Sequence, residues 1–515
     1  MAVPAKRGVY RTITLQDGSI LQVELRGDEH LHYFEAADGR VFQQVENSFK
    51  QLDPLQLETE HQQRLQARNN VRVNKASRIS YKGKRRGLVI MVNFQDISFT
   101  YSRDDIDSLF NQRGFNQCGM AGSVHDYFYD QSYGLFDLEF DVVGPVTVSK
   151  KASYYAAVNT RVPEMVYEAC KKVDSQVNYK QYDWDDDGYV DQVYVMFAGY
   201  CAAQGAPNTI WPHEWSLYAG KDGLYRSSDG VRVETYGTSC ELSGNGIDDT
   251  GILNGIGTPC HEFSHCMGIP DFYDTSEDGN NFGMCAWSLM DYGCYNDDGY
   301  TPCGYTAYER WVSGWLEPIV LDSGQDIVDM PAIQEEPVAY IIYNDATRYE
   351  YYILENYQRK GFDKAGYGHG MLVLHVDYNK SVWENNAINI DTLHQRMTII
   401  AADNYYTSRT LASDPFPGTR RKTSLTDSTT PAATLYNVNA DGRKYMGKPI
   451  TGIKESNGLI SFAFMGGSVT PSAVLPVTFT PNKNRADLIF DVVGRTVSRP
   501  VKGLYIHNGR KYFVR

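Results

Sequence analysis

The stretch Thr258-Pro-Cys-His-Glu-Phe-Ser-His-Cys-Met-Gly-Ile-Pro-Asp-Phe-Tyr-Asp274 decides how this sequence folds around a chemical site. It contains the pattern His261-Glu262-x-x-His265. Residues four apart on a helix share one face, so both imidazoles can bind one metal ion. Glu262 follows the first histidine and can act on a water molecule at that ion. The pattern therefore predicts a zinc site with two histidine ligands and a glutamate general base.

Gly268 and Asp271 extend the pattern. We expect the helix to start at an N-cap on Thr258 and to end near Gly268, which can take the left-handed conformation that turns the chain. Asp271 then returns ten residues after His261, and its carboxylate would be the third ligand, leaving a fourth position for water. A helix with two surface histidines is the alternative for the short motif. The full H-E-x-x-H-x-x-G-x-x-D pattern favours the metal site.

A second motif follows at Ser288-Leu-Met-Asp-Tyr292. It resembles the methionine turn that lies beneath the metal in metzincins. Met290 is therefore expected to support the site structurally, although a methionine read alone would be ordinary core. Tyr292 stands where several metzincins carry a tyrosine near the metal, so it is a candidate catalytic residue.

Length and charge limit the classes of protein. A chain of 515 residues is too long for one core, so several domains are expected. The net charge of −14, with no prominent basic patch, argues against nucleic acid as a partner. No apolar run approaches the ~20 residues that a membrane-spanning helix needs. The opening residues 1–8 contain no apolar signal segment, and we expect a secretion signal to have been removed.

All nine cysteines lie between Cys118 and Cys303, and several flank the two motifs. They are either disulfides that tie the floor of the site or buried thiols. An odd number leaves at least one thiol unpaired if the others form disulfides. The sequence leaves both alternatives open.

Residues 1–85 are expected to form a small β-rich region. Two alternating segments on either side of Asp17-Gly18 predict a hairpin, and Ala37-Asp-Gly39 predicts another. The region contains no cysteine, which excludes a cysteine switch. Its candidates for a direct zinc ligand are Asp28, Glu29, His30 and His32, although solvated side chains beside a hairpin are the simpler interpretation.

An acidic loop precedes the zinc motif. Asp183, Asp185, Asp187 and Asp191 take positions 1, 3, 5 and 9 of a calcium-loop pattern, with a glycine at position 6. The carbonyl group of Tyr189 would supply position 7. Position 12 lacks the usual glutamate, so the loop is not a full EF-hand. An acidic surface turn is the alternative to a structural Ca²⁺ site.

Short β-type segments separated by turns fill residues 319–466 and predict a β-sandwich. Residues 467–515 are expected to form a short C-terminal β module with a hairpin turn at Asn508-Gly509. The fold class is therefore a multidomain α+β protein. Its catalytic domain is expected over residues 86–318, between the N-terminal region and the sandwich.

With these residues identified, the chain resembles the M6 family of metallopeptidases, of the immune inhibitor A type, over roughly residues 80–465. The resemblance implies a secreted endopeptidase with a metzincin-like catalytic domain, an N-terminal pro-region and bound calcium. It assigns zinc to His261, His265 and Asp271, and the general base to Glu262. The motif differs from the commoner family form H-E-F-G-H at Ser264, which need not touch zinc. The resemblance also rests on Ser123-Val, Ser132-Tyr-Gly134, the loop 183–191, Thr306-Ala-Tyr-Glu-Arg310, Leu354-Glu-Asn356 and Gly370-Met-Leu-Val-Leu-His-Val-Asp377.

The tail resembles the C-terminal sorting modules of proteins exported by the type IX secretion system. The similar residues are Gly494-Arg495 and Lys502-Gly-Leu-Tyr-Ile506. This resemblance implies attachment to a bacterial cell surface through the tail. A purely structural β cap is the competing interpretation.

The expected function is that of a secreted zinc metalloendopeptidase acting on proteins or peptides, with Zn²⁺ in the site and Ca²⁺ as a structural ion. One alternative is a surface binding or adhesion protein on a peptidase scaffold, against which the intact Glu262 argues. Another is a narrow peptidase acting on glycoproteins, which would cut mucin but not general substrates. Zinc binding together with a generic protease assay separates the first two hypotheses, and cleavage of mucin identifies the third.

Overall fold

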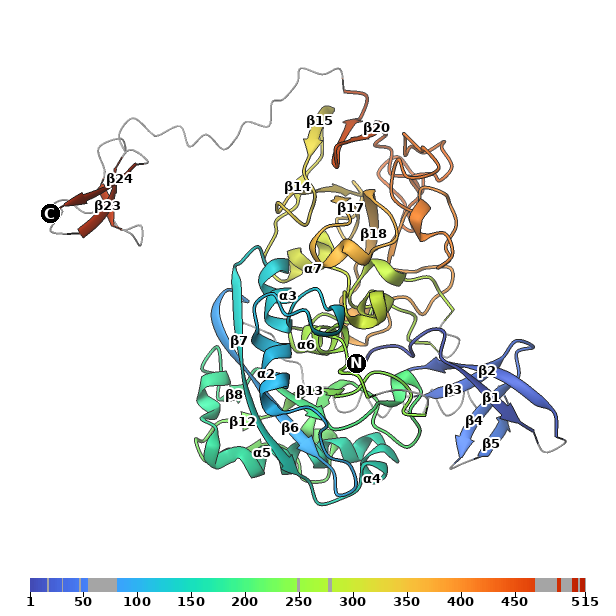
Figure 1. Ribbon diagram of the computed structural model, residues 1–515. Coiled ribbons are helices and arrows are strands. Elements are labelled where there is room, and N and C mark those ends of the chain that lie inside the picture. Colours follow the sequence, from blue (N-terminus) through green and yellow to red (C-terminus); the bar gives the residue numbers. More distant parts are fainter. Residues whose placement is uncertain are drawn as a thin grey trace. The chain divides into compact units, whose positions relative to one another are not determined.

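The computed structural model describes residues 1–15, 18–29, 31–45, 48–53, 81–247, 251–276, 280–467, 489–491, 503–507 and 510–514. The chain divides into two compact units, residues 1–468 and 469–515. The first unit contains all the helices drawn in Figure 1, and the described residues of the second unit form strands. The predicted α+β class is confirmed by this mixture of helices and several sheets.

The first unit opens with a five-stranded antiparallel sheet in simple chain order. Both predicted hairpins are present, because β1 pairs with β2 and β3 pairs with β4. Apolar side chains of this sheet, such as Leu25 and Phe42, join the same buried cluster as the helix of the zinc motif. The strands are β1 (Tyr10–Thr14), β2 (Ile20–Gly27), β3 (His32–Ala36), β4 (Val41–Val45) and β5 (Ser48–Leu52).

A second five-stranded sheet, of order β10-β13-β9-β6-β7, forms the centre of the unit. Four of its strands are parallel, and β10 pairs antiparallel at the edge. The middle strands are near-continuous apolar runs because helices and loops bury both faces. Its strands are β6 (Gly83–Asn93), β7 (Phe136–Thr147), β9 (Val193–Phe197), β10 (Glu214–Ser216) and β13 (Thr235–Cys240), and a small neighbouring sheet contains β8 (Tyr189–Val190), β11 (Tyr225–Arg226) and β12 (Arg232–Val233).

Helices pack around this sheet, and several of them begin with a side-chain N-cap. The side chain of Ser123 accepts the main-chain N–H of Asp126, and Asp126 accepts that of Ser123, which together form a capping box. The α-helices are α2 (Arg103–Asn111), α3 (Val124–Gln131), α4 (Ala152–Ala156), α5 (Val162–Val173), α6 (Gly257–Cys266), α7 (Ala307–Val312) and α8 (Lys380–Glu384). The 3₁₀ helices are η1 (Gln117–Gly119), η2 (Asn159–Arg161), η3 (Asp174–Gln176), η4 (Tyr179–Tyr182), η5 (Ala202–Gln204), η6 (Leu217–Ala219), η7 (Cys285–Trp287), η8 (Tyr292–Gly299), η9 (Gly361–Ala365) and η10 (Leu411–Ser413).

The rest of the first unit contains two further sheets. Alternate residues of the larger sheet face two different cores: Ile353 and Leu374 pack with the central cluster, whereas Leu354 and Val373 pack with the smaller sheet. The larger sheet has the order β14 (Ile319–Val320), β16 (Ala339–Tyr343), β17 (Glu350–Tyr357), β18 (Gly370–Asp377) and β19 (Met397–Ile399), and the smaller has the order β15 (Gln325–Met330), β21 (Leu459–Phe464) and β20 (Ile450–Ser456).

The second unit is a three-stranded antiparallel sheet of β22 (Ile489–Asp491), β23 (Gly503–His507) and β24 (Arg510–Val514). The strands β23 and β24 pair from Gly503 with Val514 to His507 with Arg510. The turn expected between them at 508–509 lies outside the described residues. Within the described part of the chain, no helix is both long and apolar enough to cross a membrane.

Candidate metal centre

Helix α6 carries the zinc motif through the centre of the unit. It begins at Gly257, after Ile256, so the expected N-cap at Thr258 is wrong. Ile256 takes the N-cap position without a side-chain hydrogen bond, and Thr258 already lies inside the helix. A Cβ atom on Gly257 would lie 1.9 Å from the carbonyl oxygen of Cys294, so only a glycine fits at this first helical position. At the other end, Gly268 has φ of +86°, as the pattern predicted.

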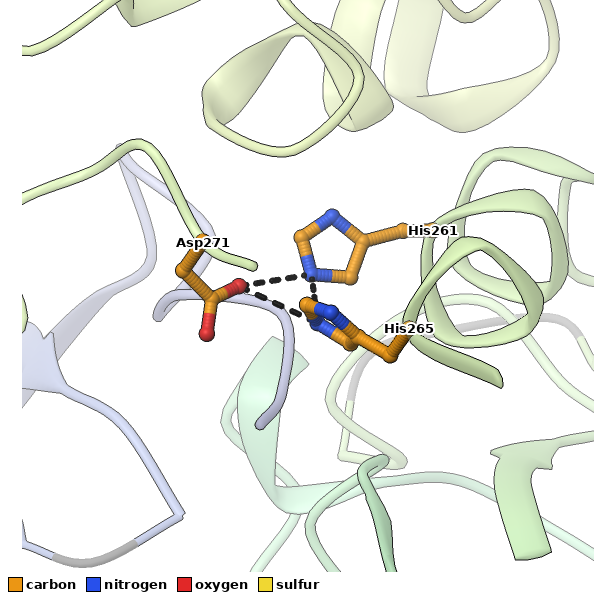
Figure 2. A group of neighbouring side chains, drawn as sticks. All are labelled: His261, His265 and Asp271. Atoms are coloured by element: carbon orange, nitrogen blue, oxygen red, sulfur yellow. Dashed lines mark hydrogen bonds and ion pairs between the residues drawn. The ribbon is translucent and has the colours of Figure 1, made fainter. Parts of the chain in front are cut away.

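The three predicted ligands meet at one point. The Nε2 atoms of His261 and His265 lie 3.0 Å apart, and each lies 3.1 Å from Oδ1 of Asp271. Figure 2 shows both rings and the carboxylate pointing toward one another. All three side chains are fully buried. The sequence pattern predicted that these three side chains converge, and they do so in the structure.

Main-chain carbonyl groups orient both rings. The Nδ1 atom of His261 lies 2.7 Å from the carbonyl oxygen of Leu289, and that of His265 lies 2.7 Å from the carbonyl oxygen of Ile269. A carbonyl oxygen can only accept, so each Nδ1 carries the proton and each Nε2 presents a lone pair to the centre. This is the tautomer that a metal ligand requires.

Burial and neighbouring charges also favour a neutral His265 and an ionised Asp271. Burial lowers the pKa of His265, which keeps that ring neutral. Burial alone would raise the pKa of Asp271, but the neighbouring imidazoles hold it below its usual range. The centre therefore combines a carboxylate with a neutral imidazole, which is the donor set of a divalent cation.

Main-chain groups of Leu289 and Met290 contact residues at or next to this centre. The Met290 side chain is fully buried, and its carbonyl oxygen accepts the main-chain N–H of Phe272 at 2.8 Å. Because Leu289 orients His261, the turn at residues 289–290 connects the helix to the segment that carries Asp271. A supporting role of the Met290 side chain beneath the metal stays a prediction.

Asn386 is a site residue that sequence reasoning missed. Its Oδ1 atom accepts the main-chain N–H of Asp271 at 2.7 Å, and its Nδ2 atom donates to Oδ2 of Asp271 at 2.6 Å. It follows α8, has φ of +52°, and lies 115 residues beyond Asp271 in the sequence. No local pattern links the two positions, so only the fold identifies this contact.

Glu262 is buried beside the centre, with an exposed fraction of 0%. Its Oε1 atom accepts the main-chain N–H of Val3 at 2.8 Å, and its Oε2 atom has no hydrogen-bond partner among the described residues. Burial raises the pKa of Glu262 well above its ordinary value. Val3 is a second contact that sequence reasoning missed, since the expected candidates near the zinc were residues 28–32.

Tyr292 is half-buried at the start of η8. The guanidinium group of Arg7 lies over its ring, 3.6 Å from the centroid. Burial raises the pKa of Tyr292, and Arg7 partly opposes that change. The hydroxyl group is therefore neutral near pH 7 and can donate a hydrogen bond.

The acidic loop folds into a compact cluster. Carboxylate oxygens of Asp183, Asp185 and Asp187 lie within 4.8 Å of one another. Asp183 accepts the main-chain N–H groups of Asp187 and Gly188, at 3.1 and 2.9 Å. Burial and the neighbouring carboxylates raise the pKa of Asp183. The side chain of Asp191 is turned to the N–H of Trp184, and the Tyr189 hydroxyl accepts from Arg232.

The cysteines are free thiols in this structure, and not disulfides. Seven of the nine are buried thiols in this structure, and Cys118 is an exposed one. Burial raises the pKa of Cys260, Cys294 and Cys303 well above the ordinary thiol value. These side chains act as small apolar groups around the centre.

Comparison with known proteins agrees with this geometry. Residues 82–316 match the family model described as the catalytic domain of immune inhibitor A peptidase M6. Over this segment, the chain is similar to the catalytic domain of M6 peptidases. The matched M6 segment begins one residue before β6 and ends after α7, so it contains both α6 and Tyr292.

Two curated relatives are named pre-pro-metalloprotease PrtV and immune inhibitor A. The chain is 25% identical over 245 residues to the pre-pro-metalloprotease PrtV of Vibrio cholerae serotype O1, covering 41% of this chain and 25% of that protein. It is 26% identical over 231 residues to immune inhibitor A of Bacillus thuringiensis subsp. alesti, covering 38% of this chain and 33% of that protein. The alignments thus span a third or less of these relatives.

Proposed function

We propose that this chain is a secreted zinc metalloendopeptidase that hydrolyses peptide bonds in proteins. The observation that carries the proposal is the convergence of His261, His265 and Asp271 beside the buried carboxylate of Glu262. The match of residues 82–316 to the M6 catalytic domain supports the same reaction class.

The three side chains fit a zinc ion. Two ligand atoms at ~2.0–2.1 Å from a tetrahedral zinc lie roughly 3.3 Å apart. The separations of 3.0–3.1 Å between the three donor atoms are close to that value. Two Nε2 lone pairs and one carboxylate oxygen leave a coordination position for water or substrate. When bound, zinc supplies Lewis-acid chemistry, acidifying a water molecule and polarising a carbonyl group.

Glu262 is the residue proposed to move the proton. Its carboxylate follows the first ligand on α6, and only Val3 occupies one of its oxygens among the described residues. We propose that it takes a proton from the attacking water and then delivers that proton to the nitrogen of the departing amine. Tyr292, with its neutral hydroxyl group, is proposed to donate a hydrogen bond to the developing oxyanion.

Metal analysis and hydrolysis of a peptide library test this function together. The expected result is stoichiometric zinc in the full chain, with cleavage that a chelator abolishes and added zinc restores. Glu262→Gln is expected to keep zinc but lower kcat/KM by roughly 10²- to 10⁴-fold. Glu336→Gln, an exposed glutamate in the same chain, is the matched control. Undiminished cleavage by Glu262→Gln, or no bound zinc, would overturn the proposal.

Several features of the whole chain belong to this proposal. We propose residues 1–85 as a pro-region, 86–318 as the catalytic domain, 319–466 as a β-sandwich and 467–515 as a sorting module for the cell surface. Asp183, Asp185, Asp187, the Tyr189 carbonyl group and Asp191 are proposed to hold a structural Ca²⁺. The carboxylate cluster and the pre-pro name of PrtV support the calcium site and the pro-region respectively.

A further inference from the structure

A cavity of about 530 Å³ lies beside β18 and β19, away from the residues proposed for catalysis. Its volume falls within the ~300–1,000 Å³ that small-molecule sites occupy. No carboxylate, ammonium or guanidinium group is among the described side chains that line it. An ionic ligand would therefore find no counter-charge there. The cavity, here called the sheet pocket, is lined by residues that include His375, Gln395, Asn404, Tyr406, Leu435 and Tyr436.

His375 lines the sheet pocket although it is only 5% exposed. Its Nε2 atom lies 2.9 Å from Oε1 of Glu350. Burial alone would raise the pKa of Glu350, but His375 and two main-chain N–H groups hold it below its ordinary value, so this side chain is a carboxylate. A carboxylate only accepts, so Nε2 carries the proton and Nδ1 of the neutral ring presents a lone pair. No residue in the described part of the chain hydrogen-bonds that Nδ1 atom.

Tyr436 forms a rigid wall of the same pocket. Its ring stacks on that of His375, with centroids 4.9 Å apart and planes 11° apart, and on that of His394, with centroids 4.0 Å apart. Its main-chain N–H donates to Glu350 at 2.6 Å. The pocket is thus formed before any ligand enters, which lowers the entropy cost of binding.

Two exposed side chains stand at the mouth of the sheet pocket. Tyr406 is 48% exposed and packs edge-on against the ring of Phe282, with centroids 5.6 Å apart. Asn404 is exposed, has φ of +62°, and makes no side-chain hydrogen bond to any described residue. The mouth therefore presents an aromatic surface beside an unused amide group.

The sheet pocket is joined to the segment that precedes the methionine turn. Oε1 of Gln395 accepts the N–H of Gly283 at 2.8 Å, and the Thr398 hydroxyl donates to the carbonyl of Gly283 at 2.7 Å. The N–H of the next residue, Met284, donates to Asp291 in that turn at 2.9 Å. A ligand in the pocket is thus held on the same framework as the candidate metal centre, and the NH₂ group of Gln395 is left to bind it.

These groups match an uncharged molecule that carries several hydroxyl groups. A sugar hydroxyl both donates and accepts, so it can pair with the amides of Gln395 and Asn404 and with the lone pair of His375. The apolar C–H face of a sugar ring fits the Tyr406 ring and the Leu435 side chain. A purely apolar ligand would leave the amides without partners, which costs free energy.

We propose that the sheet pocket binds a neutral saccharide carried by a protein substrate, with Tyr406 as the stacking surface and Asn404 and Gln395 as hydrogen-bonding residues. The inference rests on the proposed function, because it makes glycoproteins the substrate class of that peptidase. The pocket binds the glycan, and the candidate metal centre receives the peptide.

Titration calorimetry of the full chain with methyl glycosides of neutral hexoses and N-acetylhexosamines tests the pocket without any hydrolysis. At least one neutral glycoside should bind, and the acidic sugar N-acetylneuraminic acid should not. Tyr406→Ala should weaken that binding roughly tenfold, since it removes an aromatic contact. Tyr405→Ala is the matched control, because Tyr405 is 61% exposed, adjacent in sequence and outside the pocket lining.

Asn404→Gly removes the amide while glycine keeps the φ of +62°, so it tests the pocket even if Tyr406→Ala does not fold. One neutral hydrogen bond corresponds to roughly a 2- to 12-fold change in affinity. We expect glycoside affinity to fall by that factor in Asn404→Gly. Asn457→Gly, with a φ of +54° in an exposed turn, should bind as the natural chain does.

Hydrolysis of one glycoprotein before and after enzymatic deglycosylation tests the substrate class. The natural chain should show a lower KM for the glycosylated form. Asn404→Gly and Tyr406→Ala should raise KM for that form alone and leave kcat within twofold. A merely structural role of these residues would change the kinetics of both forms equally.

The outcomes separate this inference from the proposed function. Hydrolysis without binding of any neutral glycoside overturns the pocket and leaves the peptidase. Glycoside binding that Tyr406→Ala and Asn404→Gly do not weaken also overturns the pocket. Weakened binding in these variants, in a chain that hydrolyses nothing, supports the pocket and overturns the peptidase. Equal KM for the two forms of the glycoprotein overturns the assignment of glycoproteins as substrates.

Discussion

Asn386 holds Asp271 through two hydrogen bonds, one to its main-chain N–H at 2.7 Å and one from the amide to its Oδ2 at 2.6 Å. The second oxygen of Asp271 is thereby used, and Oδ1 is left facing the two histidines. A residue outside the M6 segment thus orients a proposed zinc ligand, since the segment ends at residue 316. The later sheets are therefore part of the site and not an appendage.

Asn386→Gly is expected to lower zinc affinity by roughly 10- to 100-fold, as loss of a partner that orients a ligand does. Glycine tolerates the φ of +52° at this position, so the substitution removes the amide without adding backbone strain. Competition with a zinc-sensitive dye measures the affinity. Asn457→Gly is the control, because Asn457 has a similar φ of +54° in an exposed turn. Equal zinc affinity in both variants would show that Asn386 does not orient the ligand.

Calcium is expected to stabilise the chain through the acidic loop. Binding to the folded state alone adds about 2.7 kcal/mol when free calcium is 100 times Kd. Calcium should therefore raise the melting temperature of the natural chain, and Asp185→Asn should remove that increase. Asp186→Asn is the matched control, because Asp186 is exposed and takes no ligand position. A calcium response that survives Asp185→Asn would place the ion elsewhere.

Glu355 makes stability depend on pH. It is buried in β17 and accepts the N–H of Ala307, and burial raises its pKa to about 8 from 4.5. Between these values the folded chain retains a proton that the unfolded chain has lost. This contribution is complete below pH ~4.5 and is lost as pH rises toward the folded pKa, by about 1.4 kcal/mol per pH unit.

Glu355→Gln should therefore melt at a higher temperature than the natural chain at pH 8, with the difference shrinking toward pH 5. Glutamine keeps an oxygen for the N–H of Ala307 and cannot ionise. Differential scanning fluorimetry at intervals of half a pH unit measures the trend. Glu336→Gln, at an exposed position, should show no such trend. A constant difference across the range would contradict the raised pKa.

Tyr292→Phe is expected to lower kcat by roughly 10²- to 10³-fold, the usual effect of removing one oxyanion donor. The measurement is kcat and KM on a peptide library with zinc supplied. Tyr349→Phe, at a position that is 67% exposed, is the control. An increase in KM with unchanged kcat would show that Tyr292 binds substrate without stabilising the oxyanion.

Local pattern was enough to predict the zinc triad and Glu262. Helical periodicity puts His261 and His265 on one face, and Gly268 permits the reversal that returns Asp271. The capping box at Ser123 and the hairpins of the first sheet were predictable for the same reason, since each depends on residues a few positions apart. The M6 resemblance rested on these same local motifs.

The tertiary structure alone decided which distant residues complete the site. Val3 meets Glu262 across 259 positions, and Asn386 meets Asp271 across 115. It also shows why residue 257 is a glycine, because the neighbouring Cys294 carbonyl leaves no space for a Cβ atom there. Sequence patterns reveal helical or strand periodicity and turns, which depend on residues close together in the sequence. Contacts between remote segments depend on how separate sheets pack, and a single sequence carries no local signal of that packing.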